Sequence, residues 1–296
     1  MHALLPLLLM SASLTAAPRA DPLEPLYRRI AADLKAGRPL VVTVHVALCD
    51  NRALQCGSTR LGDGDQPRTN LYWGGAAGLK AWFDGRRGWK RVFRDPGDGQ
   101  VVLERVAYRK HVRYPPPRWR HFGVTRGFDV VLVGLGYRGR RIGVAARRFV
   151  RDVSQDRGSR LRLVDGTVIR FGGASHVVGY AGHNHLMDER RFPWPAFQRK
   201  RPVGWFVLAC MSAQYFAPRL TRAHTRTLLV TRVFMYPGAF TIEGIVRGIL
   251  AARTQRGVFR QGARYYARYQ KRSPRLIRRV FTHGGRQAYR ARYPRR

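Results

Sequence analysis

The segment His176–Asp188, "HVVGYAGHNHLMD", places two histidines directly after a short apolar run. Val177–Ala181 contains no charged residue, which is typical of a strand buried on both faces of a sheet. The run ends at Gly182, and His183 and Asn184 follow at its tip. An imidazole in this position can be a packing residue, a metal ligand or one half of a catalytic pair.

A second segment, "GWFVLACMSA", repeats this pattern with a cysteine at the tip, Cys210. If the two strands are adjacent and parallel, His183 and Cys210 emerge at the same edge of the sheet. An imidazole within hydrogen-bond reach holds a cysteine as the reactive thiolate. The backbone N–H groups of Asn184 and Cys210 are placed to bind a developing oxyanion. The alternative is a core cysteine and a strand-end histidine that never meet.

Apolar runs and helical patterns alternate along the rest of the chain. This alternation predicts an α/β domain, a mostly parallel sheet with helices on both faces, whose ligands gather at the carboxyl ends of the strands. Further strands are expected at residues 40–51, 100–112, 128–139 and 226–232. Helices are expected at residues 71–83, with Thr69 or Asn70 as the N-cap, and at 140–153 and 238–253. A short helix through Tyr215 and Phe216 is expected as well.

The amino-terminal residues 1–20 resemble a secretory signal peptide, with an apolar stretch followed by small residues. We therefore expect export, to the periplasm or outside the cell. The α/β domain is predicted to occupy residues 21–255, and a basic helical tail residues 256–296. No other run is long and apolar enough for a membrane-spanning helix.

Positive charge dominates the composition, with 56 Lys+Arg against 17 Asp+Glu and a formal net charge of +39. Such an excess predicts attraction to polyanions such as nucleic acid, anionic lipid or lipopolysaccharide, and carries no information about the fold. In the tail, an arginine recurs at every fourth position, which forms one stripe if the segment is helical. The stripe is Arg256, Arg260, Arg264, Arg268 and Arg272. It is either an anion-binding surface or the solvated face of a helix that covers the core.

Export also affects how the three cysteines are interpreted. In an oxidising compartment Cys49 and Cys56 can close a small disulfide loop. Cys210 is then left as a free thiol, which is either reactive or a buried small hydrophobic residue.

The two strands "VVGYAGHN" and "WFVLACMS" resemble the histidine and cysteine strands of caspase-like cysteine peptidases, the group that contains caspases, legumains and gingipains. The resemblance covers roughly residues 38–255, and the whole chain also resembles a group of secreted bacterial proteins. It implies a caspase-like fold and a cysteine peptidase that acts on polypeptides and needs no cofactor. In this role His183 is the general base or acid and Cys210 the nucleophile.

The resemblance also makes residues 40–51 the family's first strand, whose tip contributes to the specificity pocket. Three acids near this tip, Asp50, Asp63 and Asp65, are candidates for recognising a basic substrate side chain. The chain departs from the family where Asn184 replaces the usual glycine after the histidine. Leu208 stands where caspases have glutamine and legumains glutamate, and the histidine–cysteine spacing is shorter than usual. The hypothesis that the chain is a relative without proteolytic activity therefore stays open.

Three other functions compete with the cysteine hydrolase. Gly134–Gly139, "GLGYRG", fits the G-x-G-x-x-G pattern of a dinucleotide-binding oxidoreductase, with Asp165 near the position of a ribose-binding acid. His183, His185 and Asp188 have a spacing that suits part of a metal site, although a hydrolytic site needs three or more ligands and an open position. The third is a non-catalytic protein that binds nucleic acid or the cell envelope through its basic surface.

Overall fold

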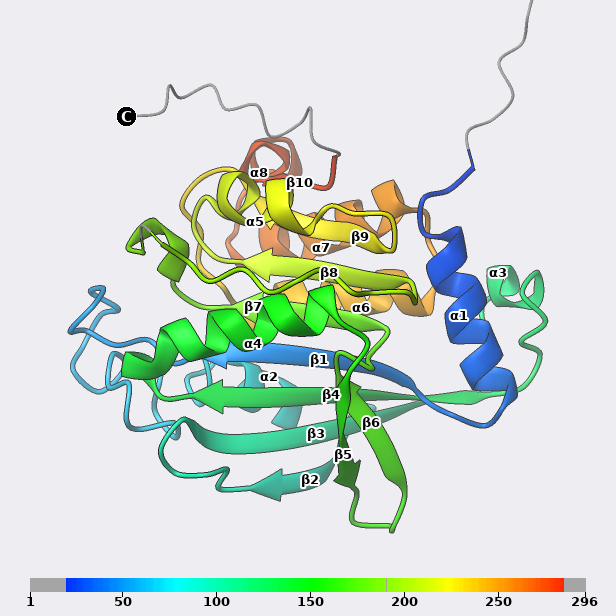
Figure 1. Cartoon of the computed structure of the whole chain (residues 1–296), viewed down its shortest axis with the longest axis horizontal. Helices are drawn as coiled ribbons and strands as arrows, with labels where there is room; N and C mark the ends of the chain where they lie inside the picture. Colours follow the sequence, from blue (N-terminus) through cyan, green and yellow to red (C-terminus); the bar gives the residue numbers. More distant parts are fainter. Residues whose placement is uncertain (1–19, 190, 285–296) are drawn as a thin grey trace, which may run out of the picture.

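The computed structural model describes residues 20–189 and 191–284. Its centre is an eight-stranded sheet with the strand order β10-β9-β8-β7-β1-β4-β3-β2 (Figure 1). A separate two-stranded hairpin is formed by β5 and β6. Residues 1–19 of the expected signal peptide and residues 285–296 of the expected tail lie outside the described residues.

The strands of the large sheet are β1 (Leu40–Ala47), β2 (Lys90–Asp95), β3 (Val102–Val112), β4 (Phe128–Tyr137), β7 (Val177–Ala181), β8 (Val203–Leu208), β9 (Thr225–Thr231) and β10 (Phe281–Thr282). The hairpin strands are β5 (Gly158–Arg162) and β6 (Val168–Gly172). The helices are α1 (Glu24–Lys35), α2 (Leu79–Asp84), α3 (Pro117–Arg120), α4 (Ile142–Ser154), α5 (Ser212–Leu220), α6 (Ala239–Leu250), α7 (Gln255–Tyr269) and α8 (Pro274–Val280). Two short 3₁₀ turns, η1 (Gly139–Arg141) and η2 (His185–Met187), complete the elements.

Five neighbouring strands of the sheet are parallel, in the order β9, β8, β7, β1 and β4. The strands at the two edges, β10 on one side and β3 with β2 on the other, pair antiparallel. The predicted α/β class with a mostly parallel sheet is therefore confirmed. The carboxyl ends of the parallel strands all lie at one edge of the sheet, on the left in Figure 1.

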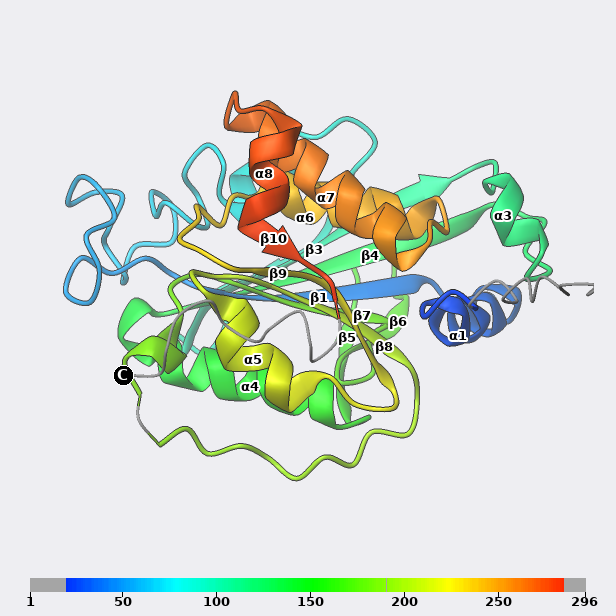
Figure 2. The ribbon, with the colours of Figure 1, turned by 90° about the horizontal axis from the view of Figure 1, so that it is seen from above.

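Helices cover both faces of the sheet, with α6, α7 and α8 on one side and α4 and α5 on the other (Figure 2). β1 contributes to both cores: Val42, Val44 and Val46 belong to the cluster under α6 and α7, whereas Val41 and Ala47 belong to the cluster under α4. Because both faces are buried, the strands read as continuous apolar runs rather than as alternating patterns.

The helix expected to begin the basic tail is present as α7, and it is packed against the domain. One face of α7 buries Val258, Phe259, Ala263 and Tyr266 in the same cluster as β9 and α6. The chain then turns back through α8 and adds β10 to the edge of the large sheet. Arg272 lies beyond the end of α7, so the regular arginine stripe stops at Arg268.

The helix predicted at residues 71–83 is wrong over most of its length, because only α2, which begins at Leu79, is helical. Asn70 does not act as a helix cap. Its side-chain oxygen accepts hydrogen bonds from the N–H groups of Cys49 and Tyr72, and its amide donates to the carbonyl oxygens of Cys49 and Asp63. These contacts with distant segments fix residues 70–78 as turns. No helix in the described ranges 20–189 and 191–284 is long and apolar enough to cross a membrane.

The G-x-G-x-x-G motif does not form a phosphate-binding loop. Gly134 and Gly136 lie inside β4, where a Cβ at Gly136 would lie only 3.1 Å from the ring of Trp73. These glycines make room for tertiary packing rather than for a nucleotide. Asp165, the expected ribose ligand, lies in the turn between β5 and β6 and forms an ion pair with Arg109 at 2.6 Å. Within the described residues, neither the motif nor Asp165 thus has the surroundings that the dinucleotide hypothesis expects.

Candidate functional site at the carboxyl edge of the sheet

The ends of β7 and β8 bring His183 and Cys210 to the same edge of the sheet. The two strands pair in parallel, with Ala181 opposite Leu208. His183 and Cys210 each follow this aligned pair by two residues, and neighbouring strands are about 4.8 Å apart. The expected juxtaposition of the two strand tips is therefore present in the fold.

Two backbone turns present these tips. Gly182 has φ +148°, and a Cβ there would lie 3.0 Å from the carbonyl oxygen of Ala47, so this position needs glycine. After Cys210 the chain reverses at Met211, a non-glycine residue in the left-handed region with φ 53°. Such a conformation is unfavourable for methionine and is held by its surroundings. The Met211 N–H donates to the Val233 carbonyl oxygen, and Ser212 exchanges hydrogen bonds with Thr231.

The His183 imidazole is held by an acid. Its Nε2 lies 2.6 Å from Asp188 Oδ2, while the side chain of His183 is 14% exposed and that of Asp188 55%. The Tyr180 hydroxyl donates to the His183 carbonyl oxygen at 2.8 Å and fixes the backbone. Within the described residues, His183 Nδ1 makes no hydrogen bond, to Cys210 or to any other group.

Asn184 ties the histidine segment to the cysteine turn. Its amide donates to the Cys210 carbonyl oxygen at 2.7 Å, and its side-chain oxygen accepts from the Leu186 N–H at 3.2 Å. In the part of the chain that the structure describes, the backbone N–H groups of Asn184 and Cys210 donate no hydrogen bond. The two predicted oxyanion donors are therefore unoccupied.

Cys210 is free and partly exposed, and it lies near Tyr72 and Tyr266. Its Sγ is 3.7 Å from the Met235 carbonyl oxygen. Burial raises the pKa of Tyr72, and the nearby Cys210 raises it further. Burial likewise raises the pKa of Tyr236, to about 12. These phenols stay protonated at neutral pH and can only donate or share hydrogen bonds near the thiol.

The histidines of the H-x-H-x-x-D pattern do not converge on one point. His185 Nε2 pairs with Glu189 at 2.8 Å, separately from the His183–Asp188 pair. The segment is not extended, because residues 185–187 form the 3₁₀ turn η2. Among the residues that the structure describes, no group of three or more His, Cys, Asp or Glu side chains is arranged to hold a metal ion. Asp188 is better understood as the partner that orients His183, a role the sequence pattern did not reveal.

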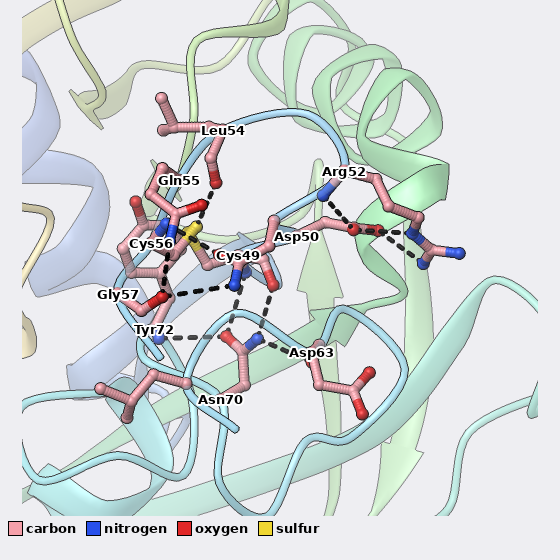
Figure 3. Close-up of a disulfide and its surroundings, with 12 residues drawn as sticks. Cys49, Asp50, Arg52, Leu54, Gln55, Cys56, Gly57, Asp63, Asn70 and Tyr72 are labelled. Atoms are coloured by element: carbon pink, nitrogen blue, oxygen red, sulfur yellow. Dashed lines mark hydrogen bonds and ion pairs between the residues drawn. A yellow bond between two sulfur atoms is a disulfide. The ribbon is translucent and has the colours of Figure 1, made fainter. Parts of the chain in front are cut away.

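The tip of β1 lies beside this site, because β1 pairs directly with β7. The predicted disulfide between Cys49 and Cys56 is confirmed, with a Cα–Cα distance of 6.1 Å (Figure 3). The amide of Asn70 bridges this tip to the following loop, as the dashed lines in Figure 3 mark. The disulfide loop is thus anchored at the carboxyl edge of the sheet.

The three candidate pocket acids lie in this same region, but two of them are engaged by arginines of the chain itself. Asp50 is buried and forms an ion pair with Arg52 at 2.7 Å. The Arg52 guanidinium holds the pKa of Asp50 below its usual value. Asp65 contacts both Arg52 and Arg138. Asp63 is exposed, and within the described residues it forms no ion pair, so it is the acid most accessible to a basic substrate group.

The arginine stripe of α7 lines a concave surface. Arg256, Arg260 and Arg264 border a hollow of about 510 Å³, together with Arg118 and Arg253. The three α7 arginines form no ion pair within the described residues. Arg268 and Arg272 do not line this hollow. The sequence pattern thus identified three of the five arginines that share it.

No protein-family model, no curated protein sequence and no solved structure matches this chain.

Proposed function

We propose that this chain is an exported cysteine hydrolase, a peptidase in which Cys210 is the nucleophile and His183 the general base and acid. The observation that carries the proposal is the parallel pairing of β7 with β8, with the two residues equally spaced from the aligned pair Ala181 and Leu208. The hydrogen bond from Asn184 to the Cys210 carbonyl oxygen supports it, because it joins the two tips directly.

In this mechanism the Cys210 proton passes to His183 Nδ1, the nitrogen that Asp188 leaves free. The thiolate attacks the carbonyl carbon of a peptide bond, and the oxyanion accepts hydrogen bonds from the Asn184 and Cys210 N–H groups. The tetrahedral intermediate collapses, the C–N bond breaks, and His183 gives its proton to the leaving amine. A water molecule then loses a proton to His183 and hydrolyses the thioester, which releases the carboxylic acid and restores the thiol.

The arrangement of β1 supports the resemblance to caspase-like peptidases. β1 lies directly beside β7, so its tip and the disulfide loop border the same edge as His183. Asp63 on this side is an exposed acid without an ion pair in the described residues. We therefore propose substrates with Arg or Lys at the cleaved bond, recognised through Asp63.

The test is hydrolysis of a fluorogenic peptide library by the mature protein and three variants. We expect preference for Arg or Lys substrates, complete loss of activity in Cys210→Ala, and a loss of at least about 100-fold in His183→Ala. His185→Ala is the matched control, since His185 is a neighbouring histidine with its own acid partner, and it should retain activity.

Two outcomes would contradict the proposal. Activity that survives in Cys210→Ala excludes a cysteine mechanism. Activity that is lost both in His185→Ala and with a chelator, while Cys210→Ala retains it, points instead to a metal site. A preference for acidic substrates, or an unchanged preference for Arg or Lys in Asp63→Asn, contradicts only the role of Asp63 in substrate recognition. Neither result bears on the cysteine mechanism.

A second candidate function is binding of polyanions through the hollow beside α7. Its support is the concave grouping of Arg256, Arg260 and Arg264 with Arg118 and Arg253, described above. Arg118 forms an ion pair with Asp21, whereas the three α7 arginines form none within the described residues. Such arginines can release the counterions of a polyanion, which makes the affinity strongly dependent on salt. A nucleic acid or an acidic polysaccharide of the cell envelope fits this chemistry.

Heparin and DNA binding across a salt series tests this candidate. The variant R256Q/R260Q/R264Q should lower the slope of log affinity against log salt by about 2 to 3. The control R268Q/R272Q removes two arginines outside the hollow and should change the slope less. Equal slopes for the two variants, or binding that does not depend on salt, would contradict a specific role for the hollow.

A further inference from the structure

A cavity of about 570 Å³ lies on the α4 side of the sheet, and it shares no lining residue with the Cys210 site. Its walls come from the carboxyl-terminal half of α4, the β5–β6 hairpin, and the strands β1, β3 and β4. Binding sites for small molecules have volumes of roughly 300–1,000 Å³. The size therefore suits a small organic ligand rather than a single ion.

Three buried polar side chains form the floor of the cavity. The Tyr137 hydroxyl lies 2.8 Å from His45 Nδ1, and His45 Nε2 lies 3.1 Å from Asp152 Oδ2. All three residues are buried, with exposed fractions of 6% or less. Burial raises the pKa of Tyr137, so the phenol keeps its proton and can donate it to His45 Nδ1. The second nitrogen, Nε2, is then the one that carries hydrogen.

His45 Nε2 is a donor without a well-formed partner. It is close to Asp152, but among the described residues it makes no hydrogen bond of good geometry. A buried polar group in this condition is destabilising unless something else satisfies it. His45 Nε2 is itself fully buried, so His45, Tyr137 and Asp152 together form part of the cavity wall, and the contacts to a ligand must come from other groups.

The walls carry more positive than negative charge. Four arginines line the cavity: Arg105, Arg148, Arg151 and Arg157. Two aspartates, Asp98 and Asp152, also line it. Arg105 is paired with Asp95 at 2.6 Å, and Arg151 lies 3.6 Å from Asp152.

The other two arginines, Arg148 and Arg157, form no ion pair within the ranges 20–189 and 191–284. Asp98 is occupied by its own turn, where its carboxylate accepts the N–H groups of residues 100–102. Arg148 still lies near enough to Asp98 to lower the pKa of that carboxyl, and its guanidinium lies 5.7 Å from the centre of the Tyr137 ring. Guanidinium groups bind the oxygens of phosphate or sulfate through paired hydrogen bonds.

The backbone is also shaped to keep this space open. Gly172, at the end of β6, has φ +71°, and a Cβ there would lie 2.9 Å from Asp152 Oδ2. A larger residue would therefore press on the carboxylate that faces His45. Glycine at this position keeps Asp152 beside His45 and leaves the wall of the cavity free.

We propose that this cavity binds a small soluble phosphomonoester, with Arg148 and Arg157 holding the phosphate group. The proposal rests on the cavity, its excess of positive charge and the two guanidinium groups without an ion pair in the described residues, and it is independent of any cysteine chemistry. The volume leaves room for an organic group beside the phosphate. Free phosphate offers the same oxyanion chemistry without that group, and a lipid headgroup offers it at a membrane surface.

Calorimetric titration of the mature protein with glycerol phosphate, inorganic phosphate and phosphatidylglycerol vesicles distinguishes these sources. We expect saturable binding of one glycerol phosphate per chain and weaker binding of inorganic phosphate. The variant R148Q/R157Q should weaken glycerol phosphate binding at least about tenfold. The matched control R147Q/R160Q removes two arginines of α4 and β5 that do not line the cavity, and it should bind like the wild type.

His45→Asn is the second variant: it removes the ring that contacts Tyr137 and Asp152 in the cavity wall, so it should weaken binding, and the thermal midpoint without ligand is followed in parallel. Equal affinity of R148Q/R157Q and R147Q/R160Q would overturn the proposal, because the positive surface alone would then explain the binding. Binding of vesicles without binding of glycerol phosphate, or no saturable binding at all, would also overturn it.

Discussion

A histidine lies just outside each end of β7. Each of the two contacts an acid, but they differ in burial and in the surroundings of the second ring nitrogen. His176, before the strand, is 2% exposed; its Nδ1 accepts from the Val41 N–H at 3.0 Å and its Nε2 lies 2.8 Å from Asp33. His183, beyond the strand, has one nitrogen on Asp188 and, within the described residues, leaves the other without a hydrogen bond. A histidine with both nitrogens satisfied serves the fold, whereas one with a free nitrogen at the carboxyl edge can serve chemistry.

The sharpest way to break this comparison is to replace each histidine in turn. His176→Ala leaves the Val41 N–H and the Asp33 carboxylate without their partner, so we expect a loss of about 2–4 kcal/mol in the free energy of unfolding. His183→Ala removes a pair with an exposed acid and should change stability by less than about 1 kcal/mol. Denaturant unfolding of both variants measures this, and equal losses would erase the distinction.

The pH dependence of stability should follow His176. Burial lowers the pKa of His176 to about 4, although Asp33 beside it acts in the opposite direction. The unfolded chain has a histidine pKa near 6.5, so it takes up a proton between about pH 6.5 and 4 that the folded chain does not. Stability should therefore fall with decreasing pH in this window, by about 3 kcal/mol in total.

The variant His176→Gln isolates this effect. Burial also lowers the pKa of His283, which acts in the same direction, so the difference between the wild type and the variant is the relevant quantity. Asp33, whose pKa is lowered by its bonds to His176 and Arg38 despite burial, loses its contribution only below about pH 4. An equal pH slope in the two proteins would contradict the assignment.

The disulfide loop after β1 lies at the same edge of the sheet as His183, so its reduction should affect the two histidines differently. Cys49 and Cys56 close a short loop after β1, and such a cross-link stabilises by about 2 kcal/mol through the unfolded chain. Reduction should lower the thermal midpoint and the rate of hydrolysis together, because the loop borders the proposed site. It should leave the acid sensitivity that His176 produces unchanged. Thiol titration should find one thiol before reduction, and three at that stage would exclude the disulfide in solution.

The parts of the fold that could be predicted are those that local pattern determines. β7, β8 and their tips follow from unbroken apolar runs that end in polar residues, and the sequence therefore placed His183 and Cys210 at one edge. The prediction of a helix at residues 71–83 was wrong because the Asn70 amide donates its hydrogen bonds to Cys49 and Asp63. Local helix propensity cannot reveal these contacts. Likewise Gly134 and Gly136 of the G-x-G-x-x-G motif lie against Trp73.

The α4-side cavity could not be predicted, because its floor joins residues far apart in the chain. His45 on β1 contacts Tyr137 on β4, 92 positions away in the sequence, and it also lies close to Asp152 on α4. In the structure His45 is buried and bonded to Tyr137. The role of Asp188 was missed because its spacing from His183 and His185 suited part of a metal site. In the structure residues 185–187 form a 3₁₀ turn, and each histidine has its own acid partner.

The central claim, that His183 activates Cys210, is tested most directly by the rate at which iodoacetamide alkylates Cys210 in the folded mature protein at neutral pH. Reactivity follows the fraction of thiolate, which a neighbouring imidazole increases. We predict fast labelling in the wild type and in His185→Ala, labelling at least about tenfold slower in His183→Ala, and none in Cys210→Ala. The same rate in the wild type and in His183→Ala, with both proteins folded, would contradict the account.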